Sequence, residues 1–250
     1  EDIKVFIEYG MLSDDKFDEK AKKFALLKNT EDKFFTLDEY KEKVGETQKD
    51  KNDKIVYLYT NDKEEHHSLI QNATEKGYDV LLLDSPLAPH LISKLEQSLE
   101  NVSFARIDAD TIEKLIDKGE EVPSKLTKEE EEKLKPIIEE VIPKEKFMVD
   151  FQSLSETDSP MQITEAEFMR RMKEQQALGG GMGFMGSMPE MYNLVVNSNH
   201  PLISKILETK TEKKKKQLIE QATDLAMLAK GMLTGEKLTK FLKRSIEIIK

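Results

Sequence analysis

Three short apolar runs recur at regular intervals along the first half of the chain. They are KIVYLYT at 54–60, DVLLLD at 79–84 and SFARID at 103–108, and each is rich in β-branched, aromatic or leucine residues. Apolar residues at helical spacing lie between the runs: Leu69, Ile70 and Ala73 in the first interval, and Leu91, Ile92, Leu95 and Leu99 in the second. This β-α-β-α-β order predicts a small three-layer α/β/α domain with a parallel sheet.

The residues before the first strand predict further helices. Ile3, Val5, Phe6 and Ile7 indicate a helix or the approach to one, and the segment KFDEKAKKFALLK at 16–28 is also typical of a helix. A third helix is predicted over 36–44, where Thr36 and Glu39 have capping-box spacing. In that motif the hydroxyl and the carboxylate satisfy each other's free backbone amides. The polar stretch 45–53 then connects to the first strand.

A charged segment at 119–145 separates two predicted domains. Prolines at 123, 136 and 143 punctuate it, and Thr127 and Glu130 repeat the capping-box spacing. We therefore expect a connector with some helical stiffness rather than a limp linker. The predicted division of the chain is 1–118, 119–145 and 146–250.

The third segment has the pattern of a mixed α+β domain. The stretches FMVDFQSL at 147–154 and MYNLVVN at 191–197 alternate apolar and polar residues, which predicts strands in a sheet with one exposed face. Between them, Thr164 and Glu167 predict the cap of a helix that carries Phe168, Met169 and Met172 on one stripe. The chain as a whole is assigned to the α/β class, α+β overall.

Seven of the eleven methionines fall between residues 161 and 191. Methionine side chains are flexible and polarizable, so that a surface rich in them repacks against many partners. The stretch GGGMGFMGSM at 179–188 does not hold a stable helix, because each glycine costs about 1 kcal/mol relative to alanine. Two interpretations stay open: the stripe packs on its own sheet beside a loose loop, or it is a mobile contact surface for other proteins.

The chain ends in a predicted helical hairpin, with helices over 211–230 and 235–249 joined by the turn MLTG. A lone hairpin leaves part of each apolar face open, and either its own sheet or an identical hairpin from a second chain covers that face. We expect the second arrangement, a C2 homodimer. The predicted interface comprises Leu218, Ala222, Leu225, Ala229, Leu238, Phe241, Leu242, Ile246 and Ile249.

Composition narrows the classes of function. The net charge of −10 argues against broad nucleic-acid binding, and the one basic run, at 213–216, is typical of a solvated helix face. The chain has no cysteine, which removes disulfides, thiolate metal sites and cysteine nucleophiles. No apolar run reaches the ~20 residues of a spanning helix. We expect a cytoplasmic protein without membrane contact, and a first residue that is not methionine suggests an excised fragment.

Candidate catalytic chemistry is sparse. Asp84 ends a predicted strand, as the phosphate-accepting aspartate of a receiver domain does, but the other acids and the lysine of such a site are not evident; capping of the next helix is the simpler interpretation. His66 and His67 are adjacent and face different directions, so we expect surface residues rather than a metal pair. His90 and His200 have no evident partner. No glycine-rich phosphate loop and no nucleophile–base pair emerge.

Several segments resemble the heat-shock protein 90 chaperones, most closely their bacterial type. The stretch TLDEYKEKVGETQKDKNDKIVYLYT is similar to a helix, connector and strand of that family's middle segment, and EKGYDVLLLDSPLAPHLISKLE resembles its next strand and helix. The start NSNHPLISKI and the end ATDLAMLAKGMLTGEKLTKFLKR resemble a helix start and the terminal dimerisation hairpin. The resemblance covers essentially the whole chain.

The resemblance implies a carboxy-terminal fragment: the end of the middle domain, then the dimerisation domain. The fragment would lack the ATP-binding domain. The resemblance therefore implies no enzyme activity, no catalytic residue and no bound cofactor or metal in this chain, and ATP and Mg²⁺ would belong to the full-length protein. Partly folded client proteins would be partners, contacted through an exposed amphipathic helix. The implied client residues are Phe168, Met169, Met172, Met182, Phe184 and Met185, and His90 stands where the family has a bulky aromatic client contact.

One rival interpretation remains, a stand-alone receiver-like α/β domain with a dimerising tail. It makes Asp84 the functional residue, whereas the chaperone interpretation makes the change Asp84→Ala nearly silent.

Overall fold

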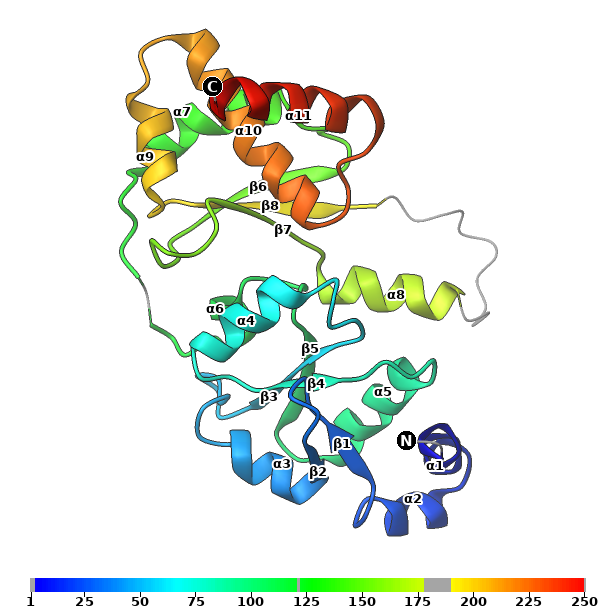
Figure 1. Cartoon of the computed structure of the whole chain (residues 1–250). Coiled ribbons are helices and arrows are strands. Elements are labelled where there is room, and N and C mark those ends of the chain that lie inside the picture. Colours follow the sequence, from blue (N-terminus) through cyan, green and yellow to red (C-terminus); the bar gives the residue numbers. More distant parts are fainter. Residues whose placement is uncertain (1–2, 121, 178–189, 250) are drawn as a thin grey trace. The chain divides into compact units, whose positions relative to one another are not determined.

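The computed structural model describes residues 3–120, 122–177 and 190–249 (Figure 1). Contacts group the chain into two compact units. The first unit comprises Glu1–Glu120 together with the helix that begins at Glu167, and the second comprises Glu121–Ala166 together with the chain from the last strand onward.

The first unit is built on the predicted parallel sheet. Its strands are β3 (Ile55–Thr60), β4 (Val80–Leu82) and β5 (Val102–Arg106), in the order β4-β3-β5, with both pairings parallel. The crossover helices are α4 (His67–Glu75) and α5 (Ala88–Ser98), where the apolar spacing predicts them. Every residue of the central strand β3 is buried, which explains its continuous apolar run.

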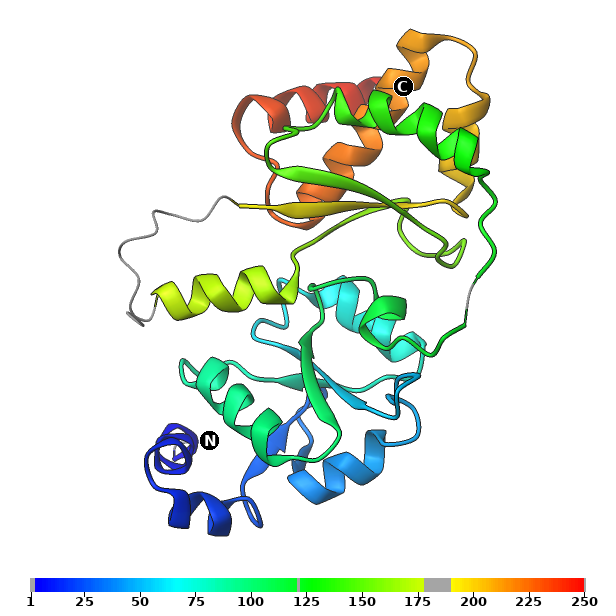
Figure 2. The same ribbon diagram turned by 180° about the vertical axis from the view of Figure 1, so that it is seen from behind.

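Alternation along β3 assigns its side chains to two cores. Tyr57 and Tyr59 pack with Leu91 of α5 in one cluster, and Leu58 packs with Ala73 of α4 in the other. Helices therefore cover both faces of the sheet, and the predicted three-layer arrangement is confirmed (Figures 1 and 2).

The N-terminal part of this unit differs from the prediction in one place. It contains α1 (Lys4–Ser13), α2 (Asp15–Ala21), the antiparallel pair β1 (Leu26–Lys28) and β2 (Phe34–Thr36), and α3 (Leu37–Val44); α6 (Ile112–Leu115) follows β5. The helix predicted over 16–28 ends at Ala21, so its last part was wrong. The Asn29 side chain accepts hydrogen bonds from the Glu31 and Lys33 amides, and this turn folds β1 back onto β2.

The second unit contains a mixed sheet. Its strands β6 (Phe147–Gln152), β7 (Met161–Thr164) and β8 (Tyr192–Asn197) have the order β6-β8-β7, with β6 parallel and β7 antiparallel to β8. Strands β6 and β8 were predicted and β7 was not. The helices are α7 (Lys128–Glu139), α9 (Pro201–Glu208), α10 (Glu212–Ala229) and α11 (Gly235–Ile249), and all four lie on one face of the sheet (Figures 1 and 2).

One core joins these elements. Val149 and Leu194 of the sheet pack with Ile138 of α7, Ile219 of α10 and Phe241 of α11. The charged connector thus contributes an amphipathic helix to the core, with Pro136 tolerated inside α7. Its N-terminus has the predicted capping box between Thr127 and Glu130.

The capping box predicted at Thr164 and Glu167 is wrong. Thr164 is the last residue of β7, where it pairs with Asn193, and α8 (Glu167–Ala177) begins three residues later. Glu167 is therefore the first helical residue instead of the third, and its carboxylate binds arginines of its own helix. Pairing within the sheet has overridden a local capping signal.

Candidate functional sites on α8 and the C-terminal hairpin

Arg244 links the two helices of the C-terminal hairpin through hydrogen bonds. Its Nε donates to Gln221 Oε1 at 2.6 Å and its Nη2 to Asp224 Oδ2 at 2.5 Å, so that one guanidinium of α11 binds two side chains of α10. Gln221 in turn donates from Nε2 to Ser245 Oγ at 3.1 Å. These bonds fix α10 against α11 and define what the pair presents to solvent.

The predicted interface residues divide between the core and the surface. Ala222 and Phe241 are buried in the unit's own core, and Leu218 and Leu238 pack partly against it. Leu225, Ala229, Leu242 and Ile246 are exposed. Ile249 lies outside the residues whose side chains are described.

The exposed residues form two short apolar stripes. Leu242 and Ile246 are one helical turn apart on α11, with 52% and 55% of their surfaces exposed. Leu225 is 45% exposed on α10, and Leu228, which was absent from the predicted set, is 44% exposed one turn later. Its spacing of three residues from Leu225 is the sequence signal that identifies Leu228. Four large aliphatic side chains of the hairpin are thus left exposed.

Helix α8 is held to the first unit by its arginines. Arg171 donates to both carboxylate oxygens of Glu96, at 2.7 and 3.1 Å, and to the Phe104 carbonyl at 2.9 Å. Arg170 is buried and donates from Nη2 to the Tyr59 hydroxyl at 2.5 Å. Glu167 accepts hydrogen bonds from both arginines.

Two members of this network, Glu96 and Arg171, have shifted pKa values. Burial by itself raises the pKa of Glu96, but hydrogen bonds from Arg171 and the Phe104 amide, with the charge of Arg171, bring it below its ordinary value. The hydrogen bond to Glu96 raises the pKa of Arg171 in spite of burial. Both groups are therefore charged at neutral pH, as a bidentate pair requires.

The client residues predicted on α8 differ in exposure. Phe168 is 70% exposed, whereas Met169 and Met172 are half-buried. Met182, Phe184 and Met185 lie outside the described residues. Arg170 and Arg171 of α8 thus contact the first unit, and the ring of Phe168 on the same helix is exposed to solvent.

The histidines include one that sequence reasoning misplaced. His66 is buried, and its Nδ1 lies 2.7 Å from Thr60 Oγ1 while its Nε2 lies 3.6 Å from Asp108 Oδ2. The expectation that it is a surface residue was wrong, because the turn into α4 places the ring beneath the end of β3. Thr60 and Asp108 are buried as well, and Asp108 also accepts a bidentate pair of bonds from Arg106. The group is a packed polar network rather than an accessible triad.

The other histidines lie nearer the surface. His67 and His90 are exposed. His200 caps α9, where its Nδ1 accepts the Leu202 amide at 3.0 Å, and partial burial lowers its pKa. The sequence NHPL, in which a proline opens the helix, is the signal for this cap.

Asp84 does not cap the following helix, contrary to the expectation. It binds Lys4 Nζ at 2.7 Å, whereas α5 begins after Leu87 with no side-chain cap. The chain turns at Ser85 instead, whose Oγ accepts the Leu87 amide. Across residues 3–120, 122–177 and 190–249 no group of three or more acidic or histidine side chains is placed to hold a metal ion.

Comparison with known proteins decides the family. The profile of the Hsp90 protein family matches residues 3–250. The chain belongs to the Hsp90 family. Its sequence is 37% identical, over 99% of its length, to the chaperone protein HtpG of Porphyromonas gingivalis, and 35% identical over the same share to HtpG of Bacteroides thetaiotaomicron. The resemblance inferred from the sequence is confirmed.

The similarity extends to a eukaryotic member of the family. An endoplasmin homolog of Dictyostelium discoideum is 23% identical over 82% of this chain. The chain spans about half the length of the bacterial relatives, since the alignment covers 46% of each. In the part of the chain that the structure describes, no helix is both long and apolar enough to cross a membrane.

Proposed function

We propose that this chain is part of an ATP-dependent molecular chaperone and supplies its homodimerisation element and a surface for partly folded clients. Family membership over residues 3–250 is the observation that carries the proposal. We assign ATP and Mg²⁺ to other parts of the full-length protein. Strand β3 ends at Thr60, the first residue of the stretch TNDKEE, which has no glycine to let backbone amides approach a phosphate. We also place the protein in the cytoplasm.

The dimer is proposed to form through the hairpin of α10 and α11. Two identical hairpins related by a twofold axis bury the same apolar surface on both chains. The exposed stripes support this role, because Leu242 and Ile246 are left open among the described residues and an identical hairpin would bury them. Arg244 supports it as well, since its hydrogen bonds to Gln221 and Asp224 hold the two helices together.

Client contact is proposed for the open side of α8. Phe168 supplies an exposed aromatic ring, and Met169 and Met172 supply adaptable side chains beside it. Weak, repackable contacts suit unfolded chains, because a rigid and closely fitted surface selects one sequence. Met182, Phe184 and Met185 are included in the proposal on the strength of the family resemblance.

The mass of the chain in solution tests the dimer. We expect sedimentation to give a dimer for the wild type at tens of micromolar. The double variant Leu242→Glu with Ile246→Glu should be a folded monomer, because the dimer would have to bury the new carboxylates of both chains at its twofold axis without a partner of opposite charge. Phe241 is unsuitable for the test, since it belongs to the second unit's own core and its replacement would destabilise that unit.

The control is Met148→Glu, which places one such charge on an exposed apolar position of β6. It should leave the dimer intact. A monomeric wild type, or a double variant that stays dimeric, would remove the hairpin interface from the proposal.

A further inference from the structure

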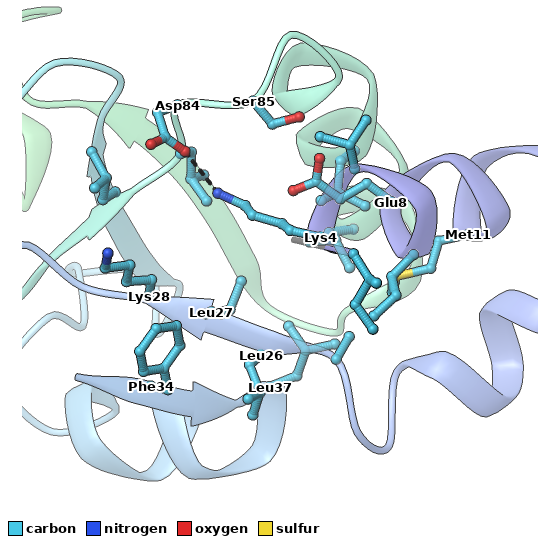
Figure 3. Close-up of a pocket in the computed structure, with 18 of the residues that line it drawn as sticks. Lys4, Glu8, Met11, Leu26, Leu27, Lys28, Phe34, Leu37, Asp84 and Ser85 are labelled. Carbon is cyan, nitrogen blue, oxygen red and sulfur yellow. Dashed lines mark hydrogen bonds and ion pairs between the residues drawn. The ribbon is translucent and has the colours of Figure 1, made fainter. Parts of the chain in front are cut away.

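A cavity of about 700 Å³ lies between α1, the β1–β2 pair, the end of β4 and α5, all within the first unit (Figure 3). Its wall is mainly apolar and includes Ile7, Met11, Leu27 and Leu91. Phe24, Leu26 and Phe34 also line it and are about half exposed, so the apolar wall continues to the surface. The volume lies within the range of small-molecule sites, roughly 300–1,000 Å³.

Four charged side chains line the cavity, and three of them have a partner of opposite charge. Lys4 binds Asp84 at 2.7 Å, and Lys28 binds Asp32 at 3.1 Å. The fourth is Glu8, which is only 6% exposed. Its Oε2 is fully buried and has no hydrogen-bond partner.

The position of Lys4 explains why Glu8 is left alone. Lys4 precedes Glu8 by four residues on α1, a spacing at which a lysine pairs with a glutamate on a helix surface. Its ammonium instead reaches across to Asp84, as Figure 3 shows. Glu8 therefore lines the cavity with no donor on its buried carboxylate oxygen.

Burying a carboxylate without a donor is costly, and a ligand that brings N–H groups to it recovers that cost. We propose that this cavity binds an amphipathic organic cation, with an ammonium group on Glu8 and an alkyl or aryl body against the leucine and phenylalanine wall. An anion of the same shape would lie beside the Glu8 carboxylate with no cation to bind it, because both lysines of the wall already bind carboxylates. None of the residues that line this cavity belongs to the sets proposed for the dimer and client surfaces.

Two probes of equal length and opposite charge test the site: n-decylamine and n-decanoate, both ionised at neutral pH. Isothermal titration of the 250-residue chain should show saturable binding of n-decylamine. Decanoate should bind at least about tenfold more weakly, and Glu8→Gln should weaken n-decylamine by at least about tenfold while leaving decanoate unchanged or stronger.

Glu19→Gln is the matched control, since it makes the same change on an exposed glutamate of α2 outside the cavity. It should bind n-decylamine as the wild type does. Thermal unfolding of Glu8→Gln should show a cooperative transition, which would establish that the variant is folded. Phe24→Ser should weaken the binding of both probes, because it shortens the apolar wall. The proposal is overturned if n-decylamine does not bind, if decanoate binds equally well, or if Glu8→Gln binds the amine as tightly as the wild type.

Discussion

The pair between Arg171 and Glu96 makes the attachment of α8 depend on pH. The pKa of Glu96 is lower in the folded chain than in the unfolded one, so its contribution to stability is complete above the ordinary value of 4.5 and is lost as the pH falls through the lowered value. Glu96→Gln should therefore cost about 1–2 kcal/mol of unfolding free energy at pH 7. The difference in unfolding free energy between the wild type and Glu96→Gln should disappear in acid. Denaturant unfolding across pH 3–7 measures this difference.

Arg171→Lys is the companion variant, because lysine keeps the charge but cannot bind both oxygens of Glu96 and the Phe104 carbonyl together. Hydrogen exchange at the amides of α8 should become faster in Arg171→Lys while exchange in β3 stays slow. If the difference in unfolding free energy between the wild type and Glu96→Gln were the same at every pH, the charge of the Glu96 carboxylate would have no part in holding α8.

Single polar residues show where sequence reasoning ends. Gln48 lies in a stretch whose composition predicts only a polar connector, yet it is fully buried. Its Nε2 donates to the Val56 carbonyl and its Oε1 accepts the Asp79 amide, both at 2.7 Å. His66 is a similar case. Such side chains are buried among partners outside their own stretch, such as the Asp79 amide for Gln48 and the Asp108 carboxylate for His66, and no local pattern records those partners.

At the scale of elements, three threonines with the same local spacing should behave differently. Thr36 and Thr127 cap α3 and α7, each accepting the amide of a glutamate three residues on. Their replacement by alanine should cost about 1 kcal/mol of unfolding free energy each. Thr164→Val should cost less than either, because the buried Thr164 hydroxyl has no hydrogen-bond partner. Equilibrium unfolding in urea compares the three variants, and equal losses would mean that Thr164 contributes as a cap after all.

The predicted elements succeeded where a local pattern repeats and failed where a distant partner decides. Strand β3, the helices α4 and α5 and the terminal hairpin each have enough periodic residues to define them. Strands β1 and β7 have three and four residues. Their extended conformation is maintained by β2 and β8, so the helix predicted through residue 28 and the cap at Thr164 were both overridden by pairing in a sheet.

The functional surfaces of the hairpin were predictable only in part. Helical spacing marks every apolar residue of α10 and α11, but it does not separate those that face the unit's own core from those left open. Ala222 and Phe241 belong to the first group and Leu242 and Ile246 to the second. That division depends on where the sheet lies relative to each helix, which is a property of the folded unit.

For the whole molecule, separate cores predict separate unfolding. The described core clusters draw either on residues 11–116 or on residues 126–241, and none draws on both. We expect two calorimetric transitions. Leu194→Ala should destabilise the second unit by about 2–5 kcal/mol and lower one Tm, and Leu58→Ala should lower the other.

Protein concentration then identifies the unit that dimerises. A dimer formed by α10 and α11 stabilises the second unit by mass action, so the transition that Leu194→Ala moves should rise in Tm as the chain is concentrated. The transition that Leu58→Ala moves should stay fixed, and in Leu242→Glu with Ile246→Glu neither should depend on concentration. A concentration-dependent first-unit transition would place the dimer contact outside the hairpin, and a single transition lowered by both core variants would mean that the two cores unfold as one.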